Sequence, residues 1–297
     1  MKKNKKRLLA LLLCISIFFT IKFSYEKYIS MLDSDDFENS YCIPDMGSFV
    51  PQGVAVSDEC IFLSLYDSYR DKNSCIYVFD MEFNLLNKCS LDNYSHVGGI
   101  SVDDNNKTLW VSGTHGSVLA YSLDDICCQD CASSIYSNEL VGRDLINYKG
   151  QKAVSYLAVS GNKLYVGNYT CMNDGKLKEY EILDDGSLKF LKVYGAPTMV
   201  QGVSFYTYGE KEYIVFSRSC GESVNSFIQM YEFDDEFDYK KREAINFEQD
   251  PMLEQICIDR NGNLMNVFEN NASPYSGKGK KSDFRVFNLS KHIKNEQ

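Results

Sequence analysis

The sequence predicts an all-β protein, a single β-propeller of about five four-stranded blades. The prediction rests on composition, on a short motif that recurs five times, and on the same order of strands after each copy. The 297 residues include 21 Tyr and 18 Phe but only five Pro and one Trp. Aromatic residues favour pleated, half-buried strands. A chain of this length that is 44% hydrophobic can bury a full core.

A six-residue motif recurs along the chain at nearly even intervals. Its copies are Pro51–Val56, Val97–Val102, Val200–Phe205 and Leu253–Ile258, and Ser155–Val159 fits between the second and third of these. The equivalent apolar residues Val54, Ile100, Leu157, Val203 and Ile256 are separated by 46, 57, 46 and 53 residues. Such spacing is typical of one propeller blade. A sixth blade would need another repeat, and the 57-residue interval leaves too little room for one.

Each motif is followed by the same series of predicted strands. Second strands are predicted at Ile61–Tyr66, Leu109–Ser112, Leu164–Asn168, Tyr213–Ser217 and Leu264–Phe268. Third strands follow at Cys75–Asp80, Ser117–Tyr121, Leu177–Glu181, Ser226–Phe233 and Phe284–Leu289, and the clearest fourth strands are Asn84–Ser90 and Ser187–Tyr194. The last repeat ends before its fourth strand. We therefore expect residues near Tyr41–Pro44 to complete that blade and close the ring.

The N-terminus has the pattern of an export signal. Five Lys or Arg residues within Lys2–Arg7 precede the apolar run Leu8–Ile21, a pattern that retains the basic end inside and places the remainder outside the cytoplasm. We expect residues 1–24 to form a cytoplasmic basic stub and a single membrane-anchor helix, 25–40 a stalk and 41–292 the propeller. The alternatives are a cleaved signal peptide, which would leave the protein secreted, and a lipoprotein signal at Cys14.

Ten of the eleven cysteines lie beyond the apolar run. Disulfides form readily in exported proteins, so we interpret the C-C-x-x-C sequence of Cys127, Cys128 and Cys131 as a disulfide-bonded loop. Buried thiols and a metal site are the alternatives, although no second Cys or His pair follows at zinc-finger spacing. Others, such as Cys60 and Cys257, lie within apolar strand patterns, where Cys serves as a small core residue.

The charge distribution argues against nucleic acid as a partner. The net charge is −10, and the basic residues gather at the two ends, in Lys2–Arg7 and Lys278–Lys281. A protein that binds phosphates would carry a basic face. We expect a monomer whose partner is a small molecule, a glycan or a surface protein.

Polar residues occupy positions that converge on the channel of the predicted propeller. The starts of the inner strands provide Gln52, Gly98, Ser155, Gln201 and Glu254, with His96 just ahead of Gly98. The ends of the second strands provide Tyr66, Asn168, Arg218, Phe268 and Glu269. Because short turns join antiparallel neighbours, both sets are expected at one mouth, in the form of a small-molecule pocket. Each residue also has a structural alternative: the Gln amides can bond water or backbone, the carboxylates can pair with Arg218, and His96 can cap a turn.

Several of these segments resemble a group of uncharacterised exported bacterial propellers over roughly residues 50–290. The segments are Pro51-Gln52-Gly53-Val54, Ser95-His96-Val97-Gly98-Gly99, Val200-Gln201-Gly202-Val203 and Phe268-Glu269. The resemblance implies a fold and a location but no activity. One departure is Glu254-Gln255, where that group often shows Glu-Gly.

More distantly, Pro51–Val54 looks like the opening of gluconolactonase-like and paraoxonase-like propellers. In those, an acidic residue at this place binds a divalent metal on the channel axis, whereas Gln52 stands here and the repeats number five instead of six. If Glu254 and Glu269 supply oxygen ligands, calcium is the metal that suits them. We expect no other cofactor.

Two functions follow from these residues. In the first, the protein is a binding module whose ligand contacts Gln52, His96, Ser155, Gln201, Tyr66, Asn168 and Phe268. In the second, it is a lactonase-like or glycosidase-like hydrolase in which Glu254 or Glu269 acts as a general base or metal ligand and Arg218 stabilises an oxyanion. The sequence contains no Gly-x-Ser-x-Gly, His-Glu-x-x-His or phosphate-binding glycine loop.

Overall fold

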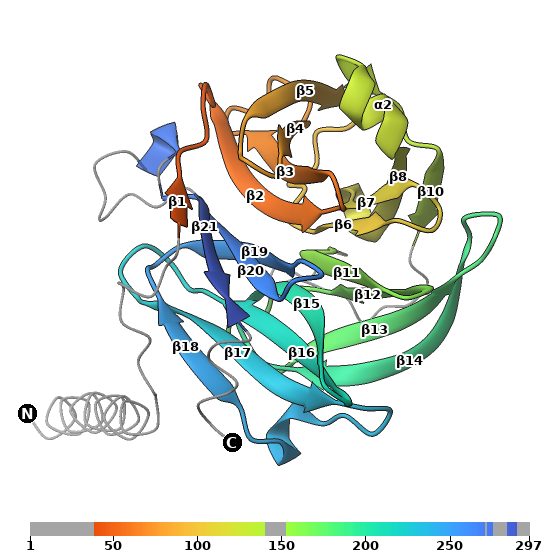
Figure 1. Cartoon of the computed structure of the whole chain (residues 1–297), viewed down its shortest axis with the longest axis vertical. Coiled ribbons are helices and arrows are strands. Elements are labelled where there is room, and N and C mark those ends of the chain that lie inside the picture. Colours follow the sequence, from red (N-terminus) through yellow and green to blue (C-terminus); the bar gives the residue numbers. More distant parts are fainter. Residues whose placement is uncertain (1–38, 140–152, 271, 276–283, 290–297) are drawn as a thin grey trace, which may run out of the picture.

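The fold is a five-bladed β-propeller. The structure, a computed structural model, describes residues 39–139, 153–270, 272–275 and 284–289. Its strands form five sheets around a central channel (Figure 1), which confirms the predicted fold class. The predicted anchor at residues 1–24 and the basic runs Lys2–Arg7 and Lys278–Lys281 lie outside the described residues. Within the part that is described, no helix is long and apolar enough to cross a membrane.

The blades follow one another along the chain. Blade 1 contains β2 (Phe49–Val56), β3 (Cys60–Asp67), β4 (Cys75–Asp80) and β5 (Leu85–Leu91). Blade 2 contains β6 (Ile100–Asp103), β7 (Thr108–Ser112), β8 (Ser117–Ser122) and β10 (Tyr136–Glu139). Blade 3 contains β11 (Tyr156–Ser160), β12 (Lys163–Gly167), β13 (Gly175–Ile182) and β14 (Leu188–Ala196). Blade 4 contains β15 (Val200–Tyr208), β16 (Lys211–Arg218), β17 (Ser226–Phe233) and β18 (Ile245–Gln249). Blade 5 contains β19 (Leu253–Ile258), β20 (Asn263–Phe268), β21 (Phe284–Asn288) and β1 (Asn39–Tyr41).

The hydrophobic core is divided among the blade interfaces. Each of five buried clusters lies between two adjacent blades, because strand side chains alternate between the two faces of a sheet. On β7, for example, Leu109 and Val111 pack toward blade 1, whereas Trp110 packs toward blade 3. The cluster between blades 5 and 1, which includes Val54 and Val267, completes the ring. Both faces of every sheet are therefore buried.

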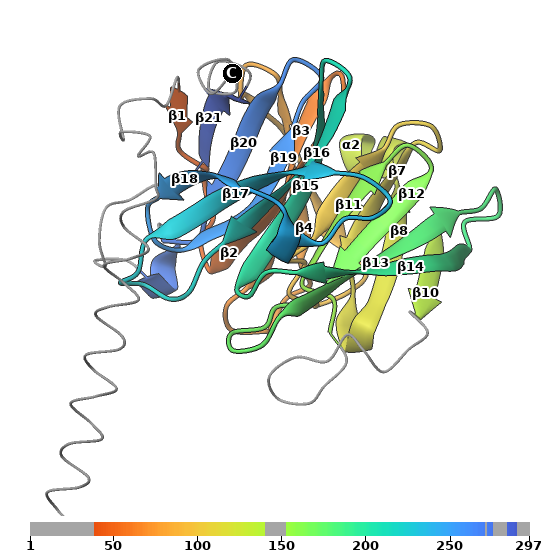
Figure 2. The same ribbon diagram turned by 90° about the horizontal axis from the view of Figure 1, so that it is seen from below.

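The N-terminal strand closes the ring as the sequence predicts, two residues earlier than expected. β1 pairs antiparallel with β21, with Asn39 opposite Val286 and Tyr41 opposite Phe284. The two strands lie side by side in both views (Figure 2). One blade thus combines the two ends of the described chain, and β1 covers the edge that β21 would otherwise expose.

The long interval between the second and third motif copies contains an inserted element, between β8 and β10 of blade 2, in place of the predicted disulfide loop. Residues Leu123–Cys128 form helix α2, and Cys131–Ala132 form β9, which pairs parallel with β5 of blade 1. Ser122 caps α2 by accepting a hydrogen bond from Asp125 N–H. All ten described cysteines are free thiols, so the expected disulfides are not present among them. Cys127 packs with Cys60 against the core between blades 1 and 2.

Candidate functional site

Three of the five inner strands carry a β-bulge at the residues predicted to face the channel. On β2 the register shifts between Pro51 and Gly53, on β15 between Val200 and Gly202, and on β19 between Leu253 and Ile256. A bulge adds a residue that has no partner in the ladder and turns its side chain out of the regular pattern. The bulged segments contain Gln52, Gln201 and the pair Glu254-Gln255.

Three of these side chains, Gln52, Gln201 and Glu254, take part with Glu269, which follows β20, in two hydrogen-bonded pairs at the end of the channel that we call the mouth. Gln52 Nε2 donates to Glu269 Oε2 at 2.9 Å and also to Pro51 O at 2.9 Å. Gln201 Nε2 donates to Glu254 Oε1 at 3.2 Å. Ser217 Oγ, on the second strand of blade 4, holds the Glu254 carbonyl at 2.6 Å. The two carboxyl groups of blade 5 are therefore each held by an amide from a neighbouring blade.

The two carboxyl groups shift each other's ionisation in a buried setting. The Glu254 side chain is buried, and desolvation raises its pKa well above the ordinary value, with the charge of Glu269 adding to the effect. Glu269 is half-buried, and desolvation raises its pKa to about 7 against the opposing hydrogen bonds from Gln52 and Tyr275. Burial therefore favours the protonated form of Glu254, and a protonated carboxyl group can donate a hydrogen bond as well as accept one. The pair can thus both donate and accept hydrogen bonds.

Aromatic side chains lie beside the carboxyl groups. Tyr275, in the 3-10 helix η4 (Ser273–Tyr275), bonds to both Glu269 and Tyr66. The Tyr66 ring lies 4.4 Å from the His96 ring, and the Arg70 guanidinium is 4.5 Å above Tyr66 on another side. His96 is exposed at the rim.

Accessibility increases from the floor of this site to its rim. Gln52 and Glu254 are buried, whereas Gln201, Tyr66, Glu269 and Tyr275 are half-buried and His96 is exposed. Ser155 is also half-buried, and its hydroxyl accepts a hydrogen bond from Tyr169 N–H. Of the residues singled out in the sequence, the structure brings Gln52 to Glu269, Gln201 to Glu254 and Tyr66 to His96.

Three predicted residues lie elsewhere or point elsewhere. Phe268 is fully buried between blades 4 and 5 beneath Arg285, so it cannot be the rim aromatic that we expected. Asn168 is buried at the end of β12. The Arg218 guanidinium is bonded to Thr198 O and Oγ1 and to Gln229 Oε1, and these contacts tie it to blade 4. A pairing of Arg218 with the two glutamates, the structural alternative that the sequence left open, is not among these contacts.

Tyr275 was missed by the sequence reasoning, because it lies in a loop outside the repeated motif. The signal that could have found it is its place between the second and third strands of blade 5, shortly after Phe268-Glu269, where the other blades carry their mouth loops. Loops held by a rigid scaffold frequently carry functional residues.

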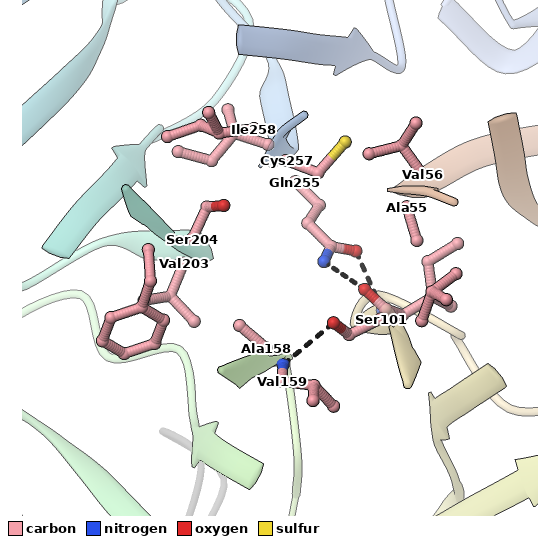
Figure 3. A pocket seen from close by; sticks show the side chains of 14 residues that line it. Ala55, Val56, Ser101, Ala158, Val159, Val203, Ser204, Gln255, Cys257 and Ile258 are labelled. Atoms are coloured by element: carbon pink, nitrogen blue, oxygen red, sulfur yellow. Dashed lines mark hydrogen bonds between the residues drawn. The ribbon is translucent and has the colours of Figure 1, made fainter. Parts of the chain in front are cut away.

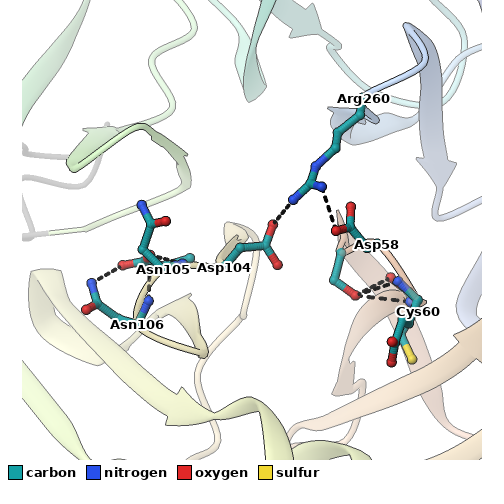
Figure 4. Close-up of polar contacts among 9 residues, drawn as sticks. Asp58, Cys60, Asp104, Asn105, Asn106 and Arg260 are labelled. Atoms are coloured by element: carbon teal, nitrogen blue, oxygen red, sulfur yellow. Dashed lines mark hydrogen bonds and ion pairs between the residues drawn. The ribbon is translucent and has the colours of Figure 1, made fainter.

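The opposite end of the channel, the lower face, has a different character (Figure 4). There the turns between first and second strands meet, and Arg260 of blade 5 pairs with Asp58 of blade 1 at 2.5 Å and with Asp104 of blade 2 at 3.4 Å. Exposed pairs of this kind contribute little to stability. Arg260 thus joins the turns of blades 5, 1 and 2 across this end of the channel.

The mouth does not offer a metal the set of ligands that the distant resemblance implies. Each glutamine amide donates to one carboxyl oxygen, Gln52 Nε2 to Glu269 Oε2 and Gln201 Nε2 to Glu254 Oε1. Among the described residues, no group of three or more His, Cys, Asp or Glu side chains is placed to hold a metal ion. We derive no chemical step through a metal at this site.

Comparisons with known proteins assign the chain to no family. No family model matches the sequence, and no curated protein matches it. Among solved structures, the chain is similar to the Dos1 propeller, with a TM-score of 0.41 and 14% identity over 78% of this chain and 57% of that one. It is also similar to the β-propeller domain of Cps50 (Swd1) from Myceliophteria thermophila, with a TM-score of 0.40 and 10% identity over 80% of this chain and 83% of that one. The chain thus spans little more than half the length of the first of these structures.

Proposed function

We propose that the protein is a binding module that holds a polyhydroxylated ligand, such as a glycan, at the mouth of its channel. The observation that carries the proposal is the convergence of Glu254 and Glu269 with amides from blades 1 and 4. Carboxyl and amide groups supply the acceptors and donors that hydroxyl groups require. Tyr66 and Tyr275 supply apolar ring surface with a polar tip, which suits the alternating character of a sugar.

The first experiment is a glycan array probed with the labelled full-length chain. Wild-type protein is compared with Glu254→Gln, which alters the floor of the mouth, and with Arg260→Ala, which alters only the lower face. We expect wild type and Arg260→Ala to bind the same glycans, and Glu254→Gln to bind them at least about tenfold more weakly. Binding that Glu254→Gln leaves unchanged would contradict the proposal, as would an array on which nothing binds.

A hydrolase is the second candidate, and the unequal environments of the two carboxyl groups favour it. Enzymes that cleave glycosides use one protonated and one ionised carboxyl group, and their environments set the two states. Incubating the bound glycans with wild-type protein and analysing them by mass spectrometry tests this candidate. Products that form with wild type but not with Glu254→Gln would establish turnover. Intact glycans with both proteins would leave the binding module as the function.

We also propose that the propeller lies outside the cytoplasm, attached by residues 1–24, and acts as a monomer. The support is the basic flank Lys2–Arg7 followed by the apolar run Leu8–Ile21. Protease added to intact cells should remove the propeller, and a version lacking residues 1–24 should be protected. Protection of the full-length chain would contradict this location.

A further inference from the structure

The Gln255 side chain crosses the channel directly beneath the mouth (Figure 3). Its Oε1 accepts a hydrogen bond from Ile100 N–H at 2.9 Å, and its Nε2 donates to Ile100 O at 2.6 Å. Nε2 also lies 3.3 Å from Leu157 O. The amide therefore joins β19 of blade 5 to β6 of blade 2 and β11 of blade 3. Neither of these blades is adjacent to blade 5 in the ring. The two hydrogen bonds of the amide to the backbone of Ile100 resemble those of a β-ladder, and they use the edge of β6 that faces the channel.

Glycines at equivalent positions make the space for this side chain. A Cβ on Gly53 would lie 2.7 Å from Gln255 Oε1, and a Cβ on Gly202 would lie 2.7 Å from Gln255 Cα. Real Cβ atoms do not approach so closely, so a side chain on Gly53 would displace the amide, and one on Gly202 would displace the backbone of Gln255. Blades 1 and 4 thus lack side chains at the position where blade 5 carries a long one.

A separate cavity of about 110 Å³ lies on the other side of Gln255, toward the lower face. Its walls are made by the continuing inner strands, including Val56, Ser101, Val159, Ser204 and Ile258 (Figure 3). Gln255 lines this cavity, whereas Gln52, Gln201, Glu254 and Glu269 do not. The cavity and the mouth are therefore divided at the level of the Gln255 amide. Gln255 itself is almost fully buried, with 1% of its surface exposed.

We propose that Gln255 is a positioning residue that closes the channel between the mouth and the lower cavity, so that a ligand enters and leaves by the mouth alone and Glu254 has no water beneath it. This inference rests on the proposed function, because it concerns the same site. Glu254 and Gln255 are adjacent in the sequence and lie in the same bulge. The residue that closes the channel is therefore attached directly to the residue that it shields.

Closure has a direct consequence for Glu254. Desolvation is the main reason why the pKa of Glu254 is raised, ahead of the charge of Glu269. If water from the lower cavity reached the carboxyl group, the ionised form would be solvated and the pKa would fall. The protonation state of Glu254 therefore reports whether the channel is closed.

The test is an infrared titration of the full-length chain without any ligand. The band of the protonated carboxyl group is assigned by its loss in Glu254→Gln and is then followed with pH in Gln255→Gly. Glycine is the residue that Gly53 and Gly202 already provide, so it opens the channel without adding a group. We expect the band to titrate at clearly lower pH than in wild type. An unchanged titration in a folded Gln255→Gly protein would overturn the proposal.

Gln249→Gly is the matched control. Gln249 is a buried glutamine on β18, away from the channel, where it donates to Glu248 O and accepts from Asn266. The Gln249→Gly protein should lose about as much stability as Gln255→Gly, but the pH at which the Glu254 band titrates should not change. A shift of equal size in Gln249→Gly would show that general loosening, and not closure of the channel, sets the titration.

Gln255→Met keeps the test decisive if the glycine variant does not fold. Methionine fills a similar volume but cannot bond to Ile100. We expect the Glu254 band to stay near its wild-type position, while Ile100 N–H exchanges with deuterium at least about tenfold faster. A large shift of the band in Gln255→Met would contradict the proposal that the volume of this side chain closes the channel. Because no ligand is used, these results stand apart from the glycan array, which alone decides the proposed function.

Discussion

At the residue scale, the site depends on a few polar side chains in unusual settings. Repetition in the sequence located Gln52, Gln201, Glu254 and Glu269, because equivalent positions of a propeller converge. It could not show which of them touch, since the bulges that direct them depend on strand register. It also placed Phe268 at the rim, where the structure has it in the core. An aromatic residue at the end of a strand can turn to either face, and pattern alone does not decide which.

The titration of Glu269 gives a prediction for stability. Below about pH 4 this group is protonated in both folded and unfolded chains. Between its ordinary pKa of 4.5 and its raised value of about 7, only the unfolded chain ionises, so the free energy of unfolding falls as pH rises through this window. Glu269→Gln should therefore raise the free energy of unfolding by about 1–3 kcal/mol at pH 8 and leave it unchanged at pH 4.

Urea denaturation of wild type and Glu269→Gln at the two pH values measures this difference. Glu59→Gln, an exposed change in the turn between β2 and β3, serves as the control for the loss of one carboxylate at the surface. A Glu269→Gln protein that is less stable than wild type at pH 8 would contradict the assignment of a raised pKa.

At the element scale, the packing of the inner strands requires glycine at specific places. Gly99 precedes β6, and a Cβ there would lie 2.6 Å from Leu157 N and 2.8 Å from Tyr156 C, which are backbone atoms of the next blade. The repeated glycines were visible in the sequence, but their closest neighbours were not, because these come from other blades. The insertion after β8 was also visible as extra length. Its helix α2 was not predicted, since the three cysteines suggested a disulfide loop.

Gly99→Ala should destabilise the protein by about 2–4 kcal/mol, because backbone atoms cannot move aside as a flexible side chain can. Gly195→Ala is the control: its Cβ would meet only Tyr239 at 3.6 Å, an ordinary contact on the outer strand β14. Gly195→Ala should change the free energy of unfolding by no more than about 0.5 kcal/mol. Thermal unfolding of both variants measures the comparison, and equal midpoints would refute the close approach of β6 and β11.

At the scale of the whole molecule, stability depends on closure of the ring. The five buried clusters each join two blades, so an open ring would expose one cluster and the two sheet faces that it covers. The count of blades and the use of the N-terminal strand followed from the sequence, because both depend on spacing. The placement of the described chain relative to a membrane does not follow from the propeller.

Removing β1 tests this closure. A chain that begins at residue 42 should unfold at a lower temperature than one that begins at residue 36, and it should self-associate, because β21 would become an exposed edge. Light scattering and thermal unfolding measure the two effects. Identical behaviour of the two chains would show that β1 does not close the ring.

Hydrogen–deuterium exchange of the full-length chain, with and without the glycan that binds best on the array, tests the central claim most directly. Bound ligand should slow exchange in the mouth segments 50–53, 96–99, 200–202, 252–255 and 268–275. Exchange in the lower-face turns 57–60, 103–106 and 259–262 should not change. Protection confined to the lower-face turns or to the outer strands would contradict the account, because the ligand would then bind away from Glu254 and Glu269.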